Sequence, residues 1–301
     1  MTFSIVAHDV DSQSWGIAVA SKFLAVGAVV PWGRAGAGAV ATQAAANLSY
    51  GPDGIDLLAN GLPAGEVVER LTGADDERDS RQCGVVDAQG RGATFTGPEC
   101  LDWAGGTAGD GFAVQGNVLA GPQVVEAMAT AWRERSDEPF GRRLLEALTA
   151  GDRAGGDRRG RQSAALRVWR AGAAYGGVLD LAVDLRVDDH RNPVEELGRL
   201  LALHELYFGK PDHKSLLPLE GALADEMASL LDRLGYQTSE GSRLAEALEN
   251  WAGTENFEER LVPGKLDPVI LEQLRRHSTA HEGADSSLTS GEPDTYAYRH
   301  R

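Results

Sequence analysis

Two short apolar runs near the start of the chain constrain its fold most strongly. Ile5–Ala7 and Ile17–Ala20 flank Asp9–Ser14, a segment rich in residues that favour turns. This pattern predicts a β-hairpin. The first residues of a chain usually fray unless tertiary structure holds them. A strand that begins at the second residue is therefore expected to lie inside a sheet and to be a working part of the protein.

Residues 1–209 carry the pattern of one large α+β unit. Short strands come in bunches with helices between them, which is typical of layered sandwiches and differs from strict βαβ alternation. A glycine-rich strand is expected to lead into a helix near Thr42. The other predicted elements are helices at Gly54–Leu71, Pro122–Arg135, Leu144–Leu148 and Pro193–Leu206, and a strand pair at 163–172 and 181–189.

The rest of the chain divides into three parts by composition. Residues 210–218 contain two prolines and several polar side chains, as a linker does. Residues 219–276 are predicted to form a small all-α unit, with helices at Leu223–Leu234, Leu244–Trp251 and Pro268–Leu274. Few apolar residues follow, so the tail, residues 277–301, is expected to be disordered.

The charge of the chain excludes one large class of partner. Its 301 residues include 45 acidic and 29 basic side chains, and the formal net charge is −16. Nucleic-acid binding depends on the neutralisation of phosphates by Lys and Arg. No nucleic-acid partner is therefore expected.

Three further features predict the location of the protein. Two cysteines, Cys83 and Cys100, are too few for a disulfide scaffold and fit a reducing compartment. The start of the chain has no basic segment followed by an apolar run, so no signal peptide is predicted. The longest apolar stretch, Phe23–Trp32, is too short to span a bilayer. These features predict a cytoplasmic protein with no membrane partner.

Thr2 is the sharpest candidate for catalysis. Its small side chain favours removal of Met1, which would leave Thr2 with a free α-amine. A threonine hydroxyl needs an adjacent base to act as a nucleophile, and an α-amine with a pKa of about 7.7–8.0 supplies one near neutral pH. The alternative is that Thr2 has no role, since many proteins begin with Met-Thr.

Longer stretches of the sequence resemble a known family. They are TFSIVAHD, WGIAVASKFLAVGAVVPW, GAGAVATQAAANLSYGP, DGFAVQGNVLAGPQVVEAM, GGDRRGRQSAALRVW and VDLRVDDH, which together cover most of residues 2–203. The chain here resembles the N-terminal nucleophile (Ntn) hydrolases, and more closely the DUF1028 family within that superfamily. The resemblance implies a four-layer αββα sandwich with Thr2 at the mouth of a cleft.

Ser21 and Lys22 are predicted to assist Thr2. They end the second strand of the hairpin, and antiparallel pairing returns that end to the side of the first residue. Lys22 would lower the pKa of the α-amine and hold the hydroxyl. The resemblance places this Ala-Ser-Lys segment where proteasome-like members keep catalytic helpers, with Ser21 in place of the usual acid. The alternative is a surface Ser-Lys pair at a strand end.

Thr42, Gln43 and Asn117 are candidates for substrate contact and oxyanion stabilisation. Gly36 and Gly38 allow close backbone approach, and N–H groups at a helix start near Thr42 and Gln43 would stabilise an oxyanion. Asn117 offers a side-chain amide for the same purpose. The structural alternatives are a packing contact with Thr42 as N-cap, and a turn at Asn117.

A local cluster of arginines stands out in this acidic chain. Arg158, Arg159 and Arg161 follow Asp157 directly. Guanidinium groups match carboxylates, so Asp157, Arg158 and Arg161 are predicted to bind a carboxylated substrate. The alternative is an internal Arg–Asp network that orders a loop.

Cofactor motifs are not recognised in the sequence. Residues 188–190 read Asp-Asp-His, but three consecutive side chains of an extended strand cannot all face one ion, so no metal is predicted. No Gly-Lys-Ser/Thr follows the glycine-rich segment, so no phosphate loop is predicted. We expect neither a metal nor an organic cofactor.

The segment 230–275 resembles the small domain, predicted to bind peptidoglycan, that accompanies some members of the same family. The matching letters are LGY, LENWAGTENFEER and LDPVILEQL. Residues 210–276 hold eight basic and thirteen acidic residues, a balance of −5 that gives no attraction to an anionic wall polymer. We expect a helical accessory module for oligomerisation, as in a homodimer, for a lid or for a partner contact. Peptidoglycan binding is the alternative.

These features predict an Ntn-type amidohydrolase. Thr2 Oγ1 would attack the carbonyl of a small amide or N-acyl substrate that carries a carboxylate, and the α-amine would move the proton. Backbone N–H groups and Asn117 would hold the oxyanion. Two alternatives belong to other classes: a non-catalytic protein of the same fold that binds a small ligand, and a scaffold that acts through its C-terminal helices.

Overall fold

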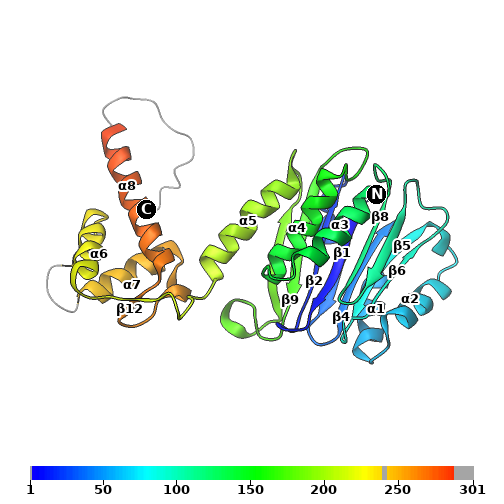
Figure 1. The fold of residues 1–301 in the computed structure, drawn as a ribbon, viewed down its shortest axis with the longest axis horizontal. Coiled ribbons are helices and arrows are strands. Elements are labelled where there is room, and N and C mark those ends of the chain that lie inside the picture. The colour runs from blue at the N-terminus through cyan, green and yellow to red at the C-terminus, as the bar shows by residue number, and fades with distance from the viewer. Residues whose placement is uncertain (1, 239–242, 288–301) are drawn as a thin grey trace. The chain divides into compact units, whose positions relative to one another are not determined.

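The computed structural model describes residues 2–238 and 243–287 (Figure 1). The chain forms two compact units, one that ends at Ala202 and one that begins at Leu203. The first unit is a mixed α and β structure with two antiparallel sheets. The second is mainly helical.

Six antiparallel strands form the larger sheet of the first unit, in the order β10-β9-β2-β1-β8-β7. Their bounds are β1 Thr2–Asp9, β2 Ser14–Ser21, β7 Gly105–Gly109, β8 Phe112–Asn117, β9 Ser163–Trp169 and β10 Leu181–Val187. Strands β1 and β2 pair from Asp9 opposite Ser14 to Phe3 opposite Ala20. The predicted hairpin is confirmed, and both of its strands are buried because they lie at the centre of this sheet.

Four antiparallel strands form the smaller sheet, in the order β3-β4-β5-β6. Their bounds are β3 Pro31–Arg34, β4 Gly38–Ala44, β5 Arg81–Asp87 and β6 Gly92–Thr96. The prediction of a helix near Thr42 is wrong, because Gly38–Ala44 pairs along its whole length with β5 and stays extended. The first helix begins only at Tyr50.

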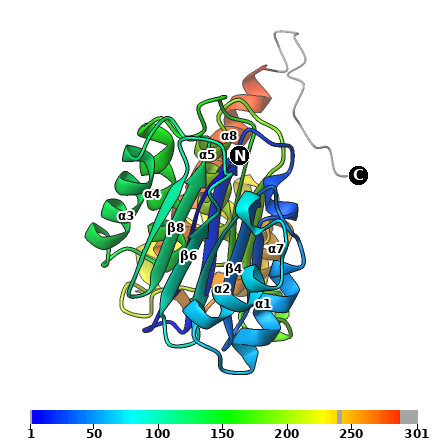
Figure 2. The ribbon, with the colours of Figure 1, turned by 90° about the vertical axis from the view of Figure 1, so that its right-hand side faces the viewer.

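The two sheets pack against each other, and each carries a pair of helices on its other face (Figure 2). Helices α3 (Gln123–Glu134) and α4 (Phe140–Arg153) cover the six-stranded sheet, and α1 (Tyr50–Ala59) and α2 (Ala64–Gly73) cover the four-stranded sheet. The single helix predicted at Gly54–Leu71 is in fact these two helices. It breaks at residues 60–63, where Gly61 has a φ of 85° and Pro63 precedes α2.

Three apolar layers hold this unit together. Val6, Ile17 and Val19 face the four-stranded sheet, where they pack with Ala39 and Ala41. The other two layers lie under α3 and α4 and under α1 and α2. Fully burying one large side chain of such a layer contributes roughly 1.5–3 kcal/mol. The hairpin is therefore packed on both of its faces, which gives the start of β1 a defined position.

Short elements complete the first unit. Turns of 3-10 helix lie at Val26–Ala28, Arg78–Ser80 and Tyr175–Gly177. The strand pair predicted at 163–172 and 181–189 is confirmed as β9 and β10. Helix α5 (Pro193–Phe208) follows and continues across residue 202 into the second unit.

The second unit contains α6 (Gly221–Arg233), α7 (Arg243–Glu255), α8 (Pro268–Ser287), a 3-10 turn at Glu258–Arg260, and the two-residue strands β11 (Leu217–Pro218) and β12 (Lys265–Leu266). It begins before the predicted linker because Leu206 and Tyr207, in the last turn of α5, pack against its core. The predicted disorder from His277 is wrong for residues 277–287, which continue α8. The ring of His277 contacts Trp251 and Phe257, and Ser278 is buried. Residues 288–301 of the predicted tail lie outside the described residues.

Candidate functional site

Thr2 begins the central strand β1 and is 4% exposed. Its Oγ1 donates a hydrogen bond to Ser21 Oγ at 3.1 Å, as the hairpin predicts for two residues at the same sheet end. On its other side Thr2 is paired with Asn117, the last residue of β8. The side chain of Lys22 is exposed, and its backbone N–H donates to Asp157 Oδ2 at 2.9 Å. The structure therefore brings Thr2, Ser21 and Asn117 together.

A network of buried amides lies beside Thr2, between the two sheets. Gln82 Oε1 accepts hydrogen bonds from Gln43 Nε2 and from Asn117 Nδ2, each at 2.8 Å. Gln82 Nε2 donates to the carbonyl of Gly116 at 2.7 Å. Gln43 Nε2 also lies 3.3 Å from the carbonyl oxygen of Thr2. The network connects the Thr2 end of β1 to strands β4, β5 and β8.

The same network extends one residue pair further along β1. Ser4 Oγ donates to Gln43 Oε1 at 2.7 Å, and Gln115 Nε2 donates to Ser4 Oγ at 2.7 Å. Gly84 leaves the space for this amide, since a Cβ there would lie 2.0 Å from Gln115 Oε1. Our sequence reasoning missed Gln82, Gln115 and Ser4. Their signal was a polar residue at an inward position of an apolar strand.

Thr42 and Gln43 do not act together. Successive strand residues point to opposite faces, so Gln43 enters the network while Thr42 lies on the other side of β4. Thr42 Oγ1 donates to the carbonyl of Asn47, and the Thr42 N–H donates to the carbonyl of Val30. Because this segment is a strand, no helix N-terminus offers free N–H groups at Thr42. The prediction of an oxyanion site built from helix N–H groups at Thr42 and Gln43 is therefore wrong.

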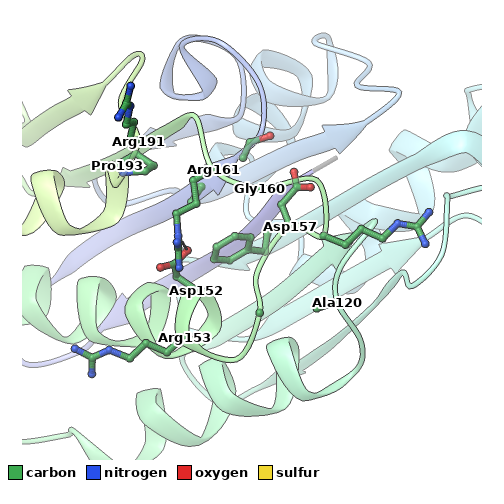
Figure 3. Close-up of a pocket in the computed structure, with 13 residues that line it drawn as sticks. Ala120, Asp152, Arg153, Asp157, Gly160, Arg161, Arg191 and Pro193 are labelled. Carbon is green, nitrogen blue, oxygen red and sulfur yellow. Dashed lines mark hydrogen bonds and ion pairs between the residues drawn. The ribbon is translucent and has the colours of Figure 1, made fainter.

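A cavity of about 550 Å³ lies next to the Thr2 end of the hairpin (Figure 3). Phe3, Ala20 and Ser21 line one side of it. The other lining residues come from the end of α4, the loop after it, the segment after β8, and residues just before and at the start of α5. Thr2 is absent from this lining, whereas its hydrogen-bond partner Ser21 belongs to it. The volume falls within the usual range of small-molecule sites.

Asp157 holds the loop that borders this cavity. Its buried carboxylate accepts hydrogen bonds from the N–H of Lys22 at 2.9 Å, from the N–H of Arg159 at 2.9 Å and from Arg159 Nη2 at 2.7 Å. The loop is also paired with the end of β8, because the N–H of Arg158 donates to the carbonyl of Val118. Asp157 and Arg159 thus form the internal Arg–Asp network that was one of the two alternatives.

The remaining arginines of the cavity differ in their partners. Arg161 Nε donates to Asp152 Oδ1 at 2.7 Å, and this carboxylate raises the pKa of Arg161. Arg153, Arg158 and Arg191 line the cavity without any side-chain hydrogen bond or ion pair to a described residue. Asp152, Arg153 and Arg191 were not predicted from the sequence, and only the fold brings Arg191 beside residues 157–161.

Other reactive groups of the described chain give no competing centre. Burial raises the pKa of the Cys83 thiol to about 12, and burial also raises the pKa of Cys100, so neither is a ready thiolate. Within residues 188–190, Asp188 pairs with Arg186, and His190 Nδ1 accepts from the N–H of Asn192. Among the residues that the structure describes, no three His, Cys, Asp or Glu side chains are placed to hold a metal ion.

Comparison with protein families matches residues 2–197 to the family model described as "Family of unknown function (DUF1028)". The chain belongs to the DUF1028 family. A solved DUF1028 structure, protein SPO2555 from Silicibacter pomeroyi, is similar to it with 32% sequence identity and a TM-score of 0.61. The alignment covers 75% of this chain and 92% of that one.

A later segment of this DUF1028 protein matches a second family. Residues 207–274 match the model described as "Putative peptidoglycan binding domain". No curated protein matches the chain. No helix among the described residues of this DUF1028 protein has the length and apolar character needed to cross a membrane.

Proposed function

We propose that this DUF1028 protein is an Ntn-type amidohydrolase that acts on a small, carboxylated amide or N-acyl substrate. In this proposal the two packed sheets and their four covering helices form the αββα sandwich of that superfamily. Met1 is removed, and Thr2 becomes the nucleophile.

The proposed reaction uses groups at the ends of three neighbouring strands, β1, β2 and β8. The α-amine of Thr2 accepts the hydroxyl proton as Oγ1 attacks the substrate carbonyl, and it then returns that proton to the leaving amine. Water, deprotonated by the same amine, cleaves the acyl-enzyme and releases the acid. Asn117 Nδ2 supports the oxyanion with its second hydrogen, since the first is donated to Gln82. Ser21 orients the hydroxyl, and the positive charge of the exposed Lys22 would favour the neutral amine.

One observation carries the proposal. The Thr2 hydroxyl binds Ser21, and Ser21 lines a cavity with cationic side chains in a chain whose net charge is −16. A potential nucleophile, an amide donor and a small-molecule cavity therefore lie at one end of the central hairpin. This combination is expected of a hydrolase for small anionic amides.

A second candidate is a binding protein without catalysis. It is favoured by the low exposure of Thr2 and by its absence from the cavity lining. In this reading the cavity holds a carboxylated ligand through its arginines, and the buried amides have only a structural role.

Two measurements separate the candidates. Intact-mass analysis of the purified protein shows whether Met1 is removed; retained Met1 leaves no free amine on Thr2 and favours the binding protein. Turnover of an amide library is then compared for wild type, Thr2→Ser, Thr2→Ala and the control Thr72→Ala. Thr72 is another buried threonine, and its hydroxyl donates to the carbonyl of Val68 in the same helix at 2.8 Å. Loss of turnover in Thr2→Ala alone supports the hydrolase, and equal turnover in Thr2→Ala and wild type excludes Thr2 as nucleophile.

For the C-terminal unit we propose an accessory role, with the full chain as a homodimer. Light scattering on the purified protein measures its mass in solution, and a monomer would contradict this proposal. The matched family favours peptidoglycan binding as the alternative. Co-sedimentation of the full chain with insoluble peptidoglycan tests it, and recovery of the protein in the pellet would support it.

A further inference from the structure

The cavity beside Ser21 has an excess of positive charge. Its lining contains four arginines, Arg153, Arg158, Arg161 and Arg191, and two aspartates, Asp152 and Asp157. Asp152 is engaged by Arg161, and Asp157 is engaged by Arg159 from outside the lining. Both carboxylates are therefore neutralised within the protein. The guanidinium groups that stay unpaired have to be matched by solvent or by a ligand.

These guanidinium groups come from separate elements. Arg153 ends α4, Arg158 belongs to the loop held by Asp157, and Arg191 precedes α5. In Figure 3, Arg153 and Arg191 lie on opposite sides of the Arg161–Asp152 pair, with their guanidinium groups well apart. One compact anion cannot contact all of them. A longer ligand with two separated anionic groups can contact guanidinium groups on two sides of the cavity.

The backbone of Arg158 is hydrogen-bonded to the segment that follows β8, next to Thr2. Its N–H is bound to the carbonyl of Val118, which follows Asn117, the partner of Thr2 in the sheet. The preceding residue, Asp157, is bound to the N–H of Lys22 at the end of β2. Arg158 therefore belongs to the Thr2 end of the cavity. The Nη groups of Arg161 have no partner among the described residues, since only its Nε is bound to Asp152.

We infer that the cavity binds a dianionic N-acyl compound, such as an N-acylated dicarboxylic amino acid. The anionic group next to the amide would be held by Arg158, and the distal anionic group by Arg161 and Arg191. This inference rests on the proposed function for the position of the amide, but the binding of the dianion does not require catalysis. It names the class of substrate that the arginines select.

Isothermal titration calorimetry with the full-length Thr2→Ala protein tests the inference without turnover. The probes are N-acetyl-glutamate, N-acetyl-glutamine and N-acetyl-glutaminamide, which have nearly the same shape and carry two, one and no carboxylates. Each carboxylate is expected to lower the Kd about tenfold, as a charge-assisted pair does. Inorganic phosphate serves as the compact anion and is expected to bind more weakly than N-acetyl-glutamate.

Two arginine variants locate the two anionic groups, and a third is the control. Arg191→Ala is expected to remove the preference for N-acetyl-glutamate over N-acetyl-glutamine, and Arg158→Ala is expected to weaken both ligands by a similar factor. Arg70→Ala is the control and should change neither, since Arg70 lines a different cavity and its side chain has no partner within 2–238 and 243–287. These arginines are exposed, so the variants should fold, and their melting temperatures verify this.

Several results would overturn the inference. They are equal binding of N-acetyl-glutamate and N-acetyl-glutamine, phosphate binding as tight as that of N-acetyl-glutamate, or the same loss in Arg70→Ala as in Arg191→Ala. Turnover by the wild type separates this inference from the proposed function. Tight binding of the dianion without hydrolysis of any amide refutes the hydrolase and keeps the inference. Hydrolysis that is equally fast for neutral and dianionic amides supports the hydrolase and refutes the inference.

Discussion

Replacing Gln82 by leucine tests whether the buried amide network beside Thr2 stabilises the pairing of the two sheets. The side chain of Gln82 makes contacts with Gln43, Asn117 and the carbonyl of Gly116, and the residue is fully buried. Leucine fills a similar volume but offers neither an acceptor nor a donor. The substitution therefore changes hydrogen bonding far more than it changes packing.

The expected cost follows from the groups that lose their partners. Asn117 Nδ2 would lose its acceptor, and Gln43 Nε2 would keep only the longer contacts at 3.3 Å to the carbonyl of Thr2 and 3.4 Å to that of Gln115. A buried polar group without a partner costs about 1–3 kcal/mol. With two such amides, we expect Gln82→Leu to lower the free energy of unfolding by about 2–4 kcal/mol.

Unfolding in guanidinium chloride, followed by tryptophan fluorescence, measures this change in the free energy of unfolding. Five of the six tryptophans, Trp15, Trp32, Trp103, Trp132 and Trp169, belong to the first unit, so the signal mainly reports on its unfolding. The matched control is Gln123→Leu at the start of α3, where an exposed amide makes one contact of 3.3 Å to the carbonyl of Ala154. The control should stay within about 0.5 kcal/mol of wild type. A Gln82→Leu protein that is also within that range would refute the assigned role of the network.

Three further predictions concern other parts of the chain. Asp157→Asn should lower the free energy of unfolding by about 2–4 kcal/mol, because it removes the charge that Arg159 and two backbone N–H groups bind, and denaturant unfolding checks this. Burial lowers the pKa of His8 below its ordinary 6.5 and outweighs the nearby carboxylates. The unfolded chain then takes up a proton at His8 more readily than the folded protein does, so the free energy of unfolding should fall as the pH drops below about 6.5. This fall should be smaller in His8→Phe, and thermal unfolding of both proteins over a range of pH measures it. Arg260→Leu should destabilise the helical unit by about 3–5 kcal/mol, since it leaves the buried Asp267 carboxylate unpaired, and hydrogen exchange over 243–274 measures this.

Each of these predictions has a control. Asp152→Asn removes a more accessible carboxylate with one arginine partner and should cost only about 1 kcal/mol; equal losses in both aspartate variants would contradict the role of Asp157 as the loop anchor. A wild type and a His8→Phe variant with parallel pH profiles would show that His8 is not the titrating group. Arg275→Leu removes an exposed pair with Glu226 and should leave the exchange rates unchanged. Equal effects in the two arginine variants would contradict the stabilising role of the Arg260–Asp267 pair.

Two strand pairs could be predicted because their signals are local. The hairpin at the start of the chain follows from two apolar runs and a turn segment. The strands β9 and β10 follow from the same kind of pattern. The helix expected near Thr42 failed because small residues such as Gly38 and Ala39 carry little preference of their own, and pairing with β5 decides their conformation.

The candidate site was predictable only in part. The contact between Thr2 and Ser21 follows from the hairpin register, since the two residues end neighbouring strands. The partners of Gln43 could not be read from the chain, because Gln82 and Asn117 reach it from strands far away in sequence. Periodicity identifies which face of a strand is buried, but not which polar groups meet there.

The local order of residues was enough to establish the hairpin, the acidic character of the chain and the presence of an arginine-rich loop, because these depend on neighbouring residues and on composition. The pairing of the charges was decided by tertiary structure. Arg159 pairs with Asp157 and Arg161 pairs with Asp152, while the side chain of Arg158 has no partner in the described part of the chain, although the three arginines lie within four positions of one another. Whether a guanidinium group forms an ion pair depends on whether the fold brings a carboxylate within reach. The distance between the two groups is set here by the packing of α4 and of the loop after it against the ends of β2 and β8.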